Sequence, residues 1–138
     1  MDAERLLQSS AQLLGLPALP RNADGAATLL LDRRWVVTIS VDPVHVTVAA
    51  ALPGLMPADK AHLLLRANFT PRTQAGGHFA IGPDEQAWLL FELHIDRCQA
   101  QDVVNAIEAC INSLERWQQR FAQDPVAPTT MPHYLQRV

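Results

Sequence analysis

The sequence predicts an α+β fold in which a twisted antiparallel sheet packs with helices, in the order α-β-β-β-α-β-β-α. Three observations lead to this prediction. Apolar residues recur every three or four positions near both ends of the chain, a spacing typical of amphipathic helices. Between them lie short runs in which apolar and β-branched residues alternate with polar ones, as in half-buried strands. Only a few residues separate neighbouring runs, so consecutive strands are expected to form antiparallel hairpins.

The length and composition suit one folded domain. A chain of 138 residues can bury roughly 65–70% of the surface that it exposes when unfolded. With 49% hydrophobic and 18% charged residues, the chain is too apolar to be intrinsically disordered. We expect the domain to span residues 1–123, and we expect residues 124–138, which include three prolines, to form an extended tail.

Charge and hydropathy exclude several classes of protein. The net charge is −3 and the basic residues are scattered, whereas a nucleic-acid-binding protein presents a basic face to phosphates. No apolar run approaches the ~20 residues that a membrane-spanning helix needs. The first residues include Asp2 and Glu4 and show no signal-peptide pattern, which predicts a cytoplasmic protein. Cys98 and Cys110 match no metal-binding spacing, and we interpret both as small buried apolar groups.

The first predicted helix covers residues 2–14. Leu6 and Leu13 belong to the apolar positions that return every three to four residues along it. Gly15 can adopt the left-handed conformation that commonly ends a helix, and Pro17 prevents the helix from continuing.

Residues 26–32, 35–42 and 44–52 are the strands of a predicted three-stranded meander. In the second strand, Val37 belongs to the face that should be core, and Val36 belongs to the opposite face. That opposite face is mixed in polarity and carries few charges, so part of it is expected to be apolar surface.

The second half of the sequence predicts two helices around a hairpin. Pro57 suits the first turn of a helix, and Asn68 suits a left-handed residue that ends it. Apolar residues spaced by four and three, from Val103 to Phe121, mark the longest helix. The predicted elements are a helix over residues 57–68, a loop over 70–77, strands over 78–82 and 87–96 joined by a turn over 83–86, and a helix over 101–123.

We predict no catalytic site, no cofactor and no metal site. The five histidines lack the spacing of a metal motif such as H-E-x-x-H. His94 and Asp96 lie two apart on a predicted strand and should point to the same side. We interpret them as a solvent-facing polar patch rather than a catalytic pair. Asp84 and Glu85 fall in a predicted hairpin turn, and we interpret them as a solvated tip.

Apolar surface remains unexplained by this fold. Leu63, Leu64 and Leu65 are consecutive and span about 200° of a helix, so one helix face cannot bury all three. Trp88 and Leu90 point away from the core face of their strand. A fully exposed leucine forgoes roughly 1.5–3 kcal/mol of burial. Either two of the leucines pack on the sheet and one stays exposed, or another subunit covers them, and we favour the second interpretation.

Several short motifs stand in the order expected of a known family. The sequence "LLGL" at residues 13–16 ends the first helix, and "DG" at 24–25 precedes the first strand. The run Leu-Leu-x-x-Asn-Phe at 64–69 is followed eight residues later by Gly-x-x-Ala-Ile at 77–81. Together with the element order, these motifs resemble the class I type III secretion chaperones, the Tir-chaperone-like family, over about residues 3–123.

That resemblance implies a function and a quaternary structure. It implies a cytoplasmic homodimer of a Gram-negative bacterium that has no enzymatic activity and uses no ATP. The dimer would bind the N-terminal segment of a secreted effector and keep it extended and secretion-competent, with the secretion-apparatus ATPase as a further candidate partner. The resemblance places six residues near the two-fold axis: Leu63, Leu64, Ala67, Phe69, Trp88 and Leu90.

An effector segment without a core of its own can be held by two kinds of contact. Its apolar side chains can enter surface grooves, and its backbone can pair with an open sheet edge. Leu30, Val36 and Ala49 are candidate groove residues, because they are apolar residues on the outward faces of the meander. Leu6 and Leu13 of the first helix are also candidates, with a position in the core as the alternative.

Two other functions are compatible with the sequence. The chain could be a small α+β enzyme or ligand-binding domain with a pocket between the sheet and the long helix. His45, Thr47 and Thr38 would supply its polar groups if their strand face turned inward. A deep closed pocket lined by His45 would favour this alternative, and a shallow apolar groove would favour the chaperone. A structural adaptor without a role in secretion would share the dimer and differ in its partner.

Overall fold

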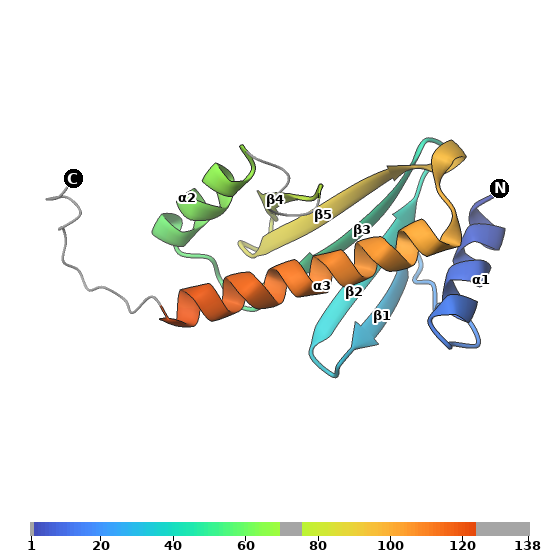
Figure 1. Ribbon diagram of the computed structural model, residues 1–138, viewed down its shortest axis with the longest axis horizontal. Helices are drawn as coiled ribbons and strands as arrows, with labels where there is room; N and C mark the ends of the chain where they lie inside the picture. Colours follow the sequence, from blue (N-terminus) through green and yellow to red (C-terminus); the bar gives the residue numbers. More distant parts are fainter. Residues whose placement is uncertain (1, 70–75, 124–138) are drawn as a thin grey trace, which may run out of the picture.

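The computed structural model describes residues 2–69 and 76–123, which contain three α-helices and five β-strands in the predicted order (Figure 1). The predicted tail over residues 124–138 and most of the predicted loop over 70–77 lie outside the described residues. The elements are α1 (Ala3–Leu13), β1 (Ala27–Leu31), β2 (Trp35–Val41), β3 (His45–Ala51), α2 (Ala58–Ala67), β4 (His78–Ile81), β5 (Ala87–His94), a 3₁₀ helix (Ile95–Arg97) and α3 (Ala100–Gln123).

The five strands form one open antiparallel sheet in the order β1-β2-β3-β5-β4. The first three strands form the predicted meander, and Asp32 and Arg33 make the tight turn between β1 and β2, both with positive φ angles. Such φ angles are those of the turns that match the twist of a hairpin. β1 and β4 are the edge strands. β4 is short and pairs with only the first half of β5, from Ala87 to Leu90.

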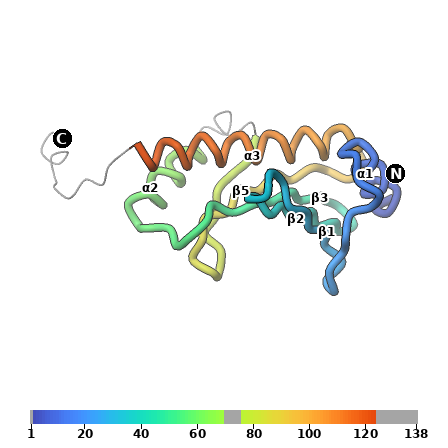
Figure 2. Tube along the Cα trace, turned by 90° about the horizontal axis from the view of Figure 1, so that it is seen from below, coloured from blue at the N-terminus to red at the C-terminus, as the bar shows by residue number. Residues whose placement is uncertain are grey.

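The helices cover one face of the sheet, which we call the inner face (Figure 2). α3 runs across this face, α1 packs against α3 near its N-terminal end, and α2 lies beside its C-terminal end. In the part of the chain that the structure describes, no helix lies on the opposite face, which we call the outer face. The inner-face core includes Trp35, Val37, Ile39, Val46, Val48, Ala50, Phe79, Leu89 and Phe91, packed against the predicted stripe of α3.

The prediction that Asn68 ends its helix in the left-handed conformation is wrong. Its φ of −64° and ψ of −20° are right-handed. The side-chain amide is used instead, because it pairs with the backbone of β4. Nδ2 donates to the Phe79 carbonyl at 2.9 Å, and the Phe79 N–H donates to Oδ1 at 2.7 Å. Asn68 therefore forms hydrogen bonds with backbone groups at the edge of β4, as a neighbouring strand would, and connects α2 to the sheet.

β5 ends two residues earlier than expected. The backbone turns into the 3₁₀ helix at Ile95, so Asp96 is not on the strand and does not share a strand face with His94. The ring of His94 instead lies 6.2 Å from that of His45, its cross-strand partner in β3, in a T-shaped arrangement. The prediction of a His94–Asp96 patch on one strand is therefore wrong.

Both cysteines are free thiols with buried side chains, as predicted. Burial raises the pKa of Cys110 to about 12, and the thiol donates a weak hydrogen bond to the Leu89 carbonyl at 3.7 Å. Burial also raises the pKa of Cys98, with a smaller contribution from the carboxylate of Asp102. Both thiols therefore stay protonated near neutral pH, and neither is an activated nucleophile. Within the described ranges, no helix is long and apolar enough to cross a membrane.

Candidate functional site

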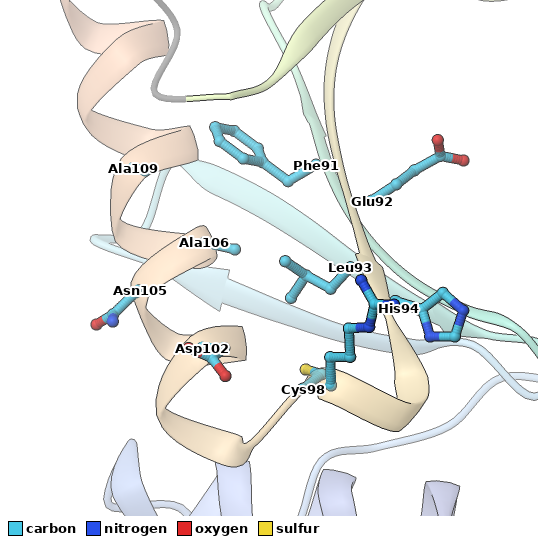
Figure 3. Close-up of a pocket in the computed structure, with 10 residues that line it drawn as sticks. Phe91, Glu92, Leu93, His94, Cys98, Asp102, Asn105, Ala106 and Ala109 are labelled. Carbon is cyan, nitrogen blue, oxygen red and sulfur yellow. The ribbon is translucent and has the colours of Figure 1, made fainter. Parts of the chain in front are cut away.

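An open groove with a volume of about 590 Å³ lies between β5 and the N-terminal half of α3 (Figure 3). Phe91 and Leu93 point from the strand toward the helix, where Ala106 and Ala109 present only methyl groups. Small side chains on the helix leave room beside the two large ones on the strand, so the floor is apolar. Arg97, Asp102 and Asn105 supply polar groups at its rim, whereas the side chains of Glu92 and His94 point away from the groove toward the other face of the sheet.

No described strand pairs with the edge of β5 beside this groove. The Ile95 N–H donates to the Val44 carbonyl at 2.9 Å, so the backbone groups of Ile95 face β3. Because these groups alternate sides along a strand, those of Glu92 and His94 face the opposite side. β4 is paired with β5 only as far as Leu90, so no described strand lies beside these two residues. Glu92 and His94 therefore offer backbone donors and acceptors to an added strand.

The groove has the chemistry of a binding surface. The Asp102 carboxylate accepts a hydrogen bond from the Gln99 N–H at 2.9 Å and so caps the start of α3. Among the residues that the structure describes, no three His, Cys, Asp or Glu side chains are grouped so that they could hold a metal ion. An apolar floor with separated polar groups on its rim can hold apolar side chains and a peptide backbone.

The outer face of the sheet carries a second apolar surface. Leu30 and Val36 are cross-strand partners in β1 and β2, and their side chains are 60% and 53% exposed. Farther along this face, Ala49 pairs with Leu90, and Trp88 lies opposite the next outward residue of β3. The sequence assigned Leu30, Val36 and Ala49 to effector binding and Trp88 and Leu90 to a dimer interface. The structure brings all five to one continuous face.

Trp88 is held in a fixed position on this face. Its indole Nε1 donates to the Asp84 carboxylate, with distances of 3.2 and 3.3 Å to the two oxygens. The ring also lies against Gly82, where a Cβ atom would come within 2.7 Å of Nε1. A glycine is therefore needed at position 82, and the half-buried indole is presented to the outer face in one orientation.

The two leucines proposed for α1 have different surroundings. Leu6 is completely buried in the core, which was the alternative considered for it, so its side chain contributes no surface for a ligand. Its carbonyl accepts a hydrogen bond from the hydroxyl of the buried Ser10 at 2.7 Å. Leu13, at the end of the helix, is exposed.

The leucine triplet of α2 is divided between core and surface. Leu64 is fully buried in the core of its own chain, and Leu63 and Ala67 are partly buried against that core. Leu65 is 56% exposed and Phe69 is 90% exposed. Leu65 was not among the residues assigned to an interface. Its spacing of four from Phe69, which places the two side chains on one helix face, is the signal that could have identified it.

The residues required by the enzyme alternative do not line the groove. Thr38, His45 and Thr47 lie on the outer face, because the residues that alternate with them pack against α3. The groove is also open to solvent and is not a closed pocket. The condition set for the enzyme or ligand-binding alternative, that this strand face turns inward, is therefore not met.

Comparisons with known proteins agree with this architecture. The sequence matches the model of the Tir chaperone protein (CesT) family over residues 5–118. One similar solved structure is the Yersinia pestis type III secretion chaperone SycH in complex with a stable fragment of YscM2. Its TM-score is 0.68 at 19% identity, with 83% of this chain and 98% of that chain covered.

Two further solved structures have slightly higher TM-scores. The ExsC–ExsE complex matches with a TM-score of 0.73 at 21% identity, covering 86% of this chain and 96% of that chain. The HopA1–SchA chaperone–effector complex matches with a TM-score of 0.72 at 14% identity, covering 83% and 91%. No curated protein sequence matches the chain. At such low identities, these structural matches show a shared fold.

Proposed function

Because the chain belongs to the Tir chaperone protein (CesT) family, we propose that it binds the N-terminal segment of a type III secretion effector and keeps that segment extended and secretion-competent. A member of this family is a secretion chaperone and not an enzyme. Holding a client in this way needs complementary surface and neither a reaction nor ATP. The structures of SycH and SchA, which share the fold, are complexes with a bound fragment and with an effector respectively.

The observation that carries this proposal is the coincidence of an open strand edge with an apolar groove. An extended client segment would pair its backbone with Glu92 and His94 of β5. Alternate side chains of that segment would then enter the groove beside Phe91 and Leu93. The backbone pairing accepts many sequences, and the groove selects for apolar side chains.

The outer face would extend the footprint of the client. A disordered segment loses conformational entropy when it is ordered, so a long contact is needed to hold it. Leu30, Val36 and Ala49 provide such a surface, and Leu13 is an additional exposed contact. Leu6 is left out of this site because its side chain is enclosed by the core.

A second part of the proposal is a homodimer built around α2. Leu65 and Phe69 are exposed on one side of this helix, and Leu63 and Ala67 are partly exposed on another side of it. A two-fold interface buries the same patch on both subunits, so each of these apolar side chains is covered in both chains. In this arrangement Leu64 supports α2 from within its own chain. Trp88 and Leu90 are assigned to the client-binding outer face, which they share with Leu30 and Val36.

The proposed setting is the cytoplasm of a Gram-negative bacterium, where a client would be held before export. The secretion-apparatus ATPase is a proposed second partner that would receive the loaded complex. Residues 1–123 would form the chaperone domain, and residues 124–138 would form an appended tail. Family membership supports the setting and the second partner, which belong to the role of a secretion chaperone, and the match over residues 5–118 supports the chaperone domain.

The proposal can be tested by producing the full chain together with N-terminal segments of secreted proteins from the same host. We expect a purified complex of two chains with one client segment. Hydrogen exchange should slow at the amides of Glu92 and His94 when the client is bound. Stable binding with unchanged exchange at these amides would remove the β5 edge from the site, and the absence of any bound segment would overturn the chaperone function.

A further inference from the structure

Phe69 is an aromatic side chain that the described part of its own chain leaves uncovered. It follows α2 directly, and 90% of its surface is exposed. The residue before it, Asn68, is fixed to the edge of β4 by two hydrogen bonds. The backbone that carries Phe69 is therefore anchored, and the aromatic ring projects from a defined place. An anchored aromatic side chain with little surrounding protein is typical of a contact completed by a second molecule.

A cavity of suitable size lies on the same helix. It has a volume of about 350 Å³ and is lined by Leu63, Arg66 and Ala67 of α2 and by Trp117 and Arg120 of α3. An enclosed apolar cavity of about 150 Å³ already accepts benzene, so this open cavity has room for one phenyl ring. Its apolar lining comes from the two apolar side chains of α2 and from the largely buried Trp117.

The lining of the cavity already belongs to an aromatic cluster. The ring of Trp117 lies 5.8 Å from that of Phe79 in a T-shaped arrangement and 5.5 Å from that of Phe121. These centroid distances are typical of favourable aromatic pairs. A further ring placed beside Trp117 would extend this cluster.

Two arginines, Arg66 and Arg120, line the cavity. The guanidinium of Arg120 lies 4.8 Å from the centroid of Trp117. The face of an aromatic ring is electron-rich and attracts such cations, so the rim is electrostatically complementary to phenylalanine.

The arrangement of residues on α2 favours exchange between two chains. At about 100° per residue, Phe69 lies roughly 120–160° around the helix from Leu63 and Ala67, with Arg66 between them on the shorter side. One chain therefore cannot place this aromatic side chain in its own cavity, and a second copy has to supply the contact. A two-fold axis at α2 would bring each such side chain toward the cavity of the other chain.

We propose that Phe69 of each chain inserts into the cavity lined by Leu63, Ala67 and Trp117 of a second copy, as the reciprocal anchor of a two-fold dimer. The inference rests on the dimer proposed above and names the contact that holds it together. The occupant of the cavity is a phenyl ring, and the arginines on the rim set the charge preference. A basic residue at position 69 would be repelled, and an acidic one would be partly tolerated.

Substitutions at position 69 of the full chain test this contact by analytical ultracentrifugation. Phe69→Ala should raise the dissociation constant of the dimer by about 100-fold or more, because each substitution removes two copies of the anchor. Phe69→Lys should weaken the dimer further, and Phe69→Glu should weaken it less than Phe69→Lys does. The difference between Phe69→Lys and Phe69→Glu should shrink as salt is added. A residue with a purely structural role would not show this dependence on the sign of the charge.

Mixing two variants separates exchange from other modes of dimerisation. One chain carries Phe69→Lys and the other carries Arg120→Glu. In the mixed dimer, the unchanged Phe69 enters an unchanged cavity, and at the second site the introduced lysine meets the introduced glutamate. Random pairing of equal amounts of the two variants would give mixed dimers as one half of all dimers. Native mass spectrometry should therefore show a larger fraction than one half. Contacts within a single chain cannot produce this preference. Arg120 is exposed, so its substitution should leave the fold intact, and circular dichroism checks this.

The outcomes distinguish this inference from the proposed function. If the wild-type dimer forms but its dissociation constant is unchanged by Phe69→Ala, the reciprocal anchor is overturned and dimerisation stands. A statistical mixture of the two variants also overturns it, as expected if the two Phe69 rings stack on each other or if another segment fills the cavity. A monomeric wild-type chain that binds client overturns the anchor and the dimer and leaves client binding standing.

Discussion

Val36 and Val37 are neighbours in β2 with the same side chain, yet Val36 is 53% exposed and Val37 is completely buried. The difference is that α3 packs on the inner face of the sheet and no described helix packs on the outer face. The apolar side chains of the outer face are therefore not needed for packing within their own chain. These leucine, valine and tryptophan side chains are best explained by a ligand that covers them.

The largest expected effect is on the inner face. Val37→Asp would bury an unpaired charge, which costs about 3–5 kcal/mol and is a large part of the stability of a domain of this size. Val36→Asp or Leu30→Asp should change the free energy of unfolding by no more than about 0.5 kcal/mol while lowering the affinity for client. Urea unfolding monitored by circular dichroism gives the first quantity, and titration with a client segment gives the second.

Ser40→Asp provides a control for these outer-face substitutions. Ser40 is exposed on the outer face near its polar end, so the same charge is introduced away from the apolar surface. Client affinity should change little. If Val36→Asp or Leu30→Asp lost the native circular dichroism signal, that residue would belong to the core, and the contrast between the two faces would not hold at that position.

Asn68→Ala tests whether α2 fixes the edge of the sheet. The substitution removes two hydrogen bonds to Phe79 and leaves backbone groups without a protein partner, so a loss of about 1–3 kcal/mol is expected. Thermal unfolding measures this loss. Asn112→Ala, at an exposed position of α3, is the matched control and should have almost no effect. Equal stability of the two variants would mean that the Asn68 contacts do not anchor α2.

The buried thiol of Cys110, on the inner face, should make the free energy of unfolding depend on pH. Burial raises its pKa to about 12 from an ordinary value of 9.0. Above about pH 9, the thiol loses its proton in the unfolded chain and keeps it in the folded chain. The contribution of this thiol to the free energy of unfolding is therefore fully present below pH 9 and is lost as the pH rises. The slope is about 1.4 kcal/mol per pH unit.

Cys110→Ala isolates this contribution. Between pH 8 and pH 10, the difference in the free energy of unfolding between wild type and variant should shrink by about 1 kcal/mol, as measured in urea. Other groups titrate in both proteins and cancel in the comparison. A difference that stays constant over this range would show that the folded and unfolded thiols ionise alike.

The smallest expected effect concerns the outer face. Asp84→Ala removes the hydrogen bond that orients Trp88 and should lower stability by about 0.5–1 kcal/mol, because the site is exposed to water. The indole should become more mobile, which time-resolved fluorescence anisotropy would detect, and client affinity should fall slightly. Glu85→Ala, one residue farther along the same turn, is the control and should leave the indole unchanged. Equal anisotropy in the two variants would show that Asp84 does not hold Trp88.

The order of helices and strands, the meander, the stripe of α3 and the family are confirmed, because each depends on periodicity or on short motifs. The motif at residues 64–69 and 77–81 was recognised as a family feature, but the sequence did not show why it contains an asparagine and a glycine. Its asparagine binds Phe79, and its following glycine, Gly77, has the ring of Phe91 within 2.7 Å of where a Cβ would be. Both contacts join residues far apart in sequence, so local patterns could not predict them.

By itself, the sequence determined which side chains of each strand share a face, because a strand places alternate residues on opposite sides whatever surrounds it. Only the tertiary structure decided which face α3 covers, that β4 stops short of Glu92 and leaves the groove beside an open edge, and that Leu64 is core while Leu65 is surface. These outcomes depend on where separate elements meet. Neighbouring leucines on a helix are chemically identical until another element packs against one of them.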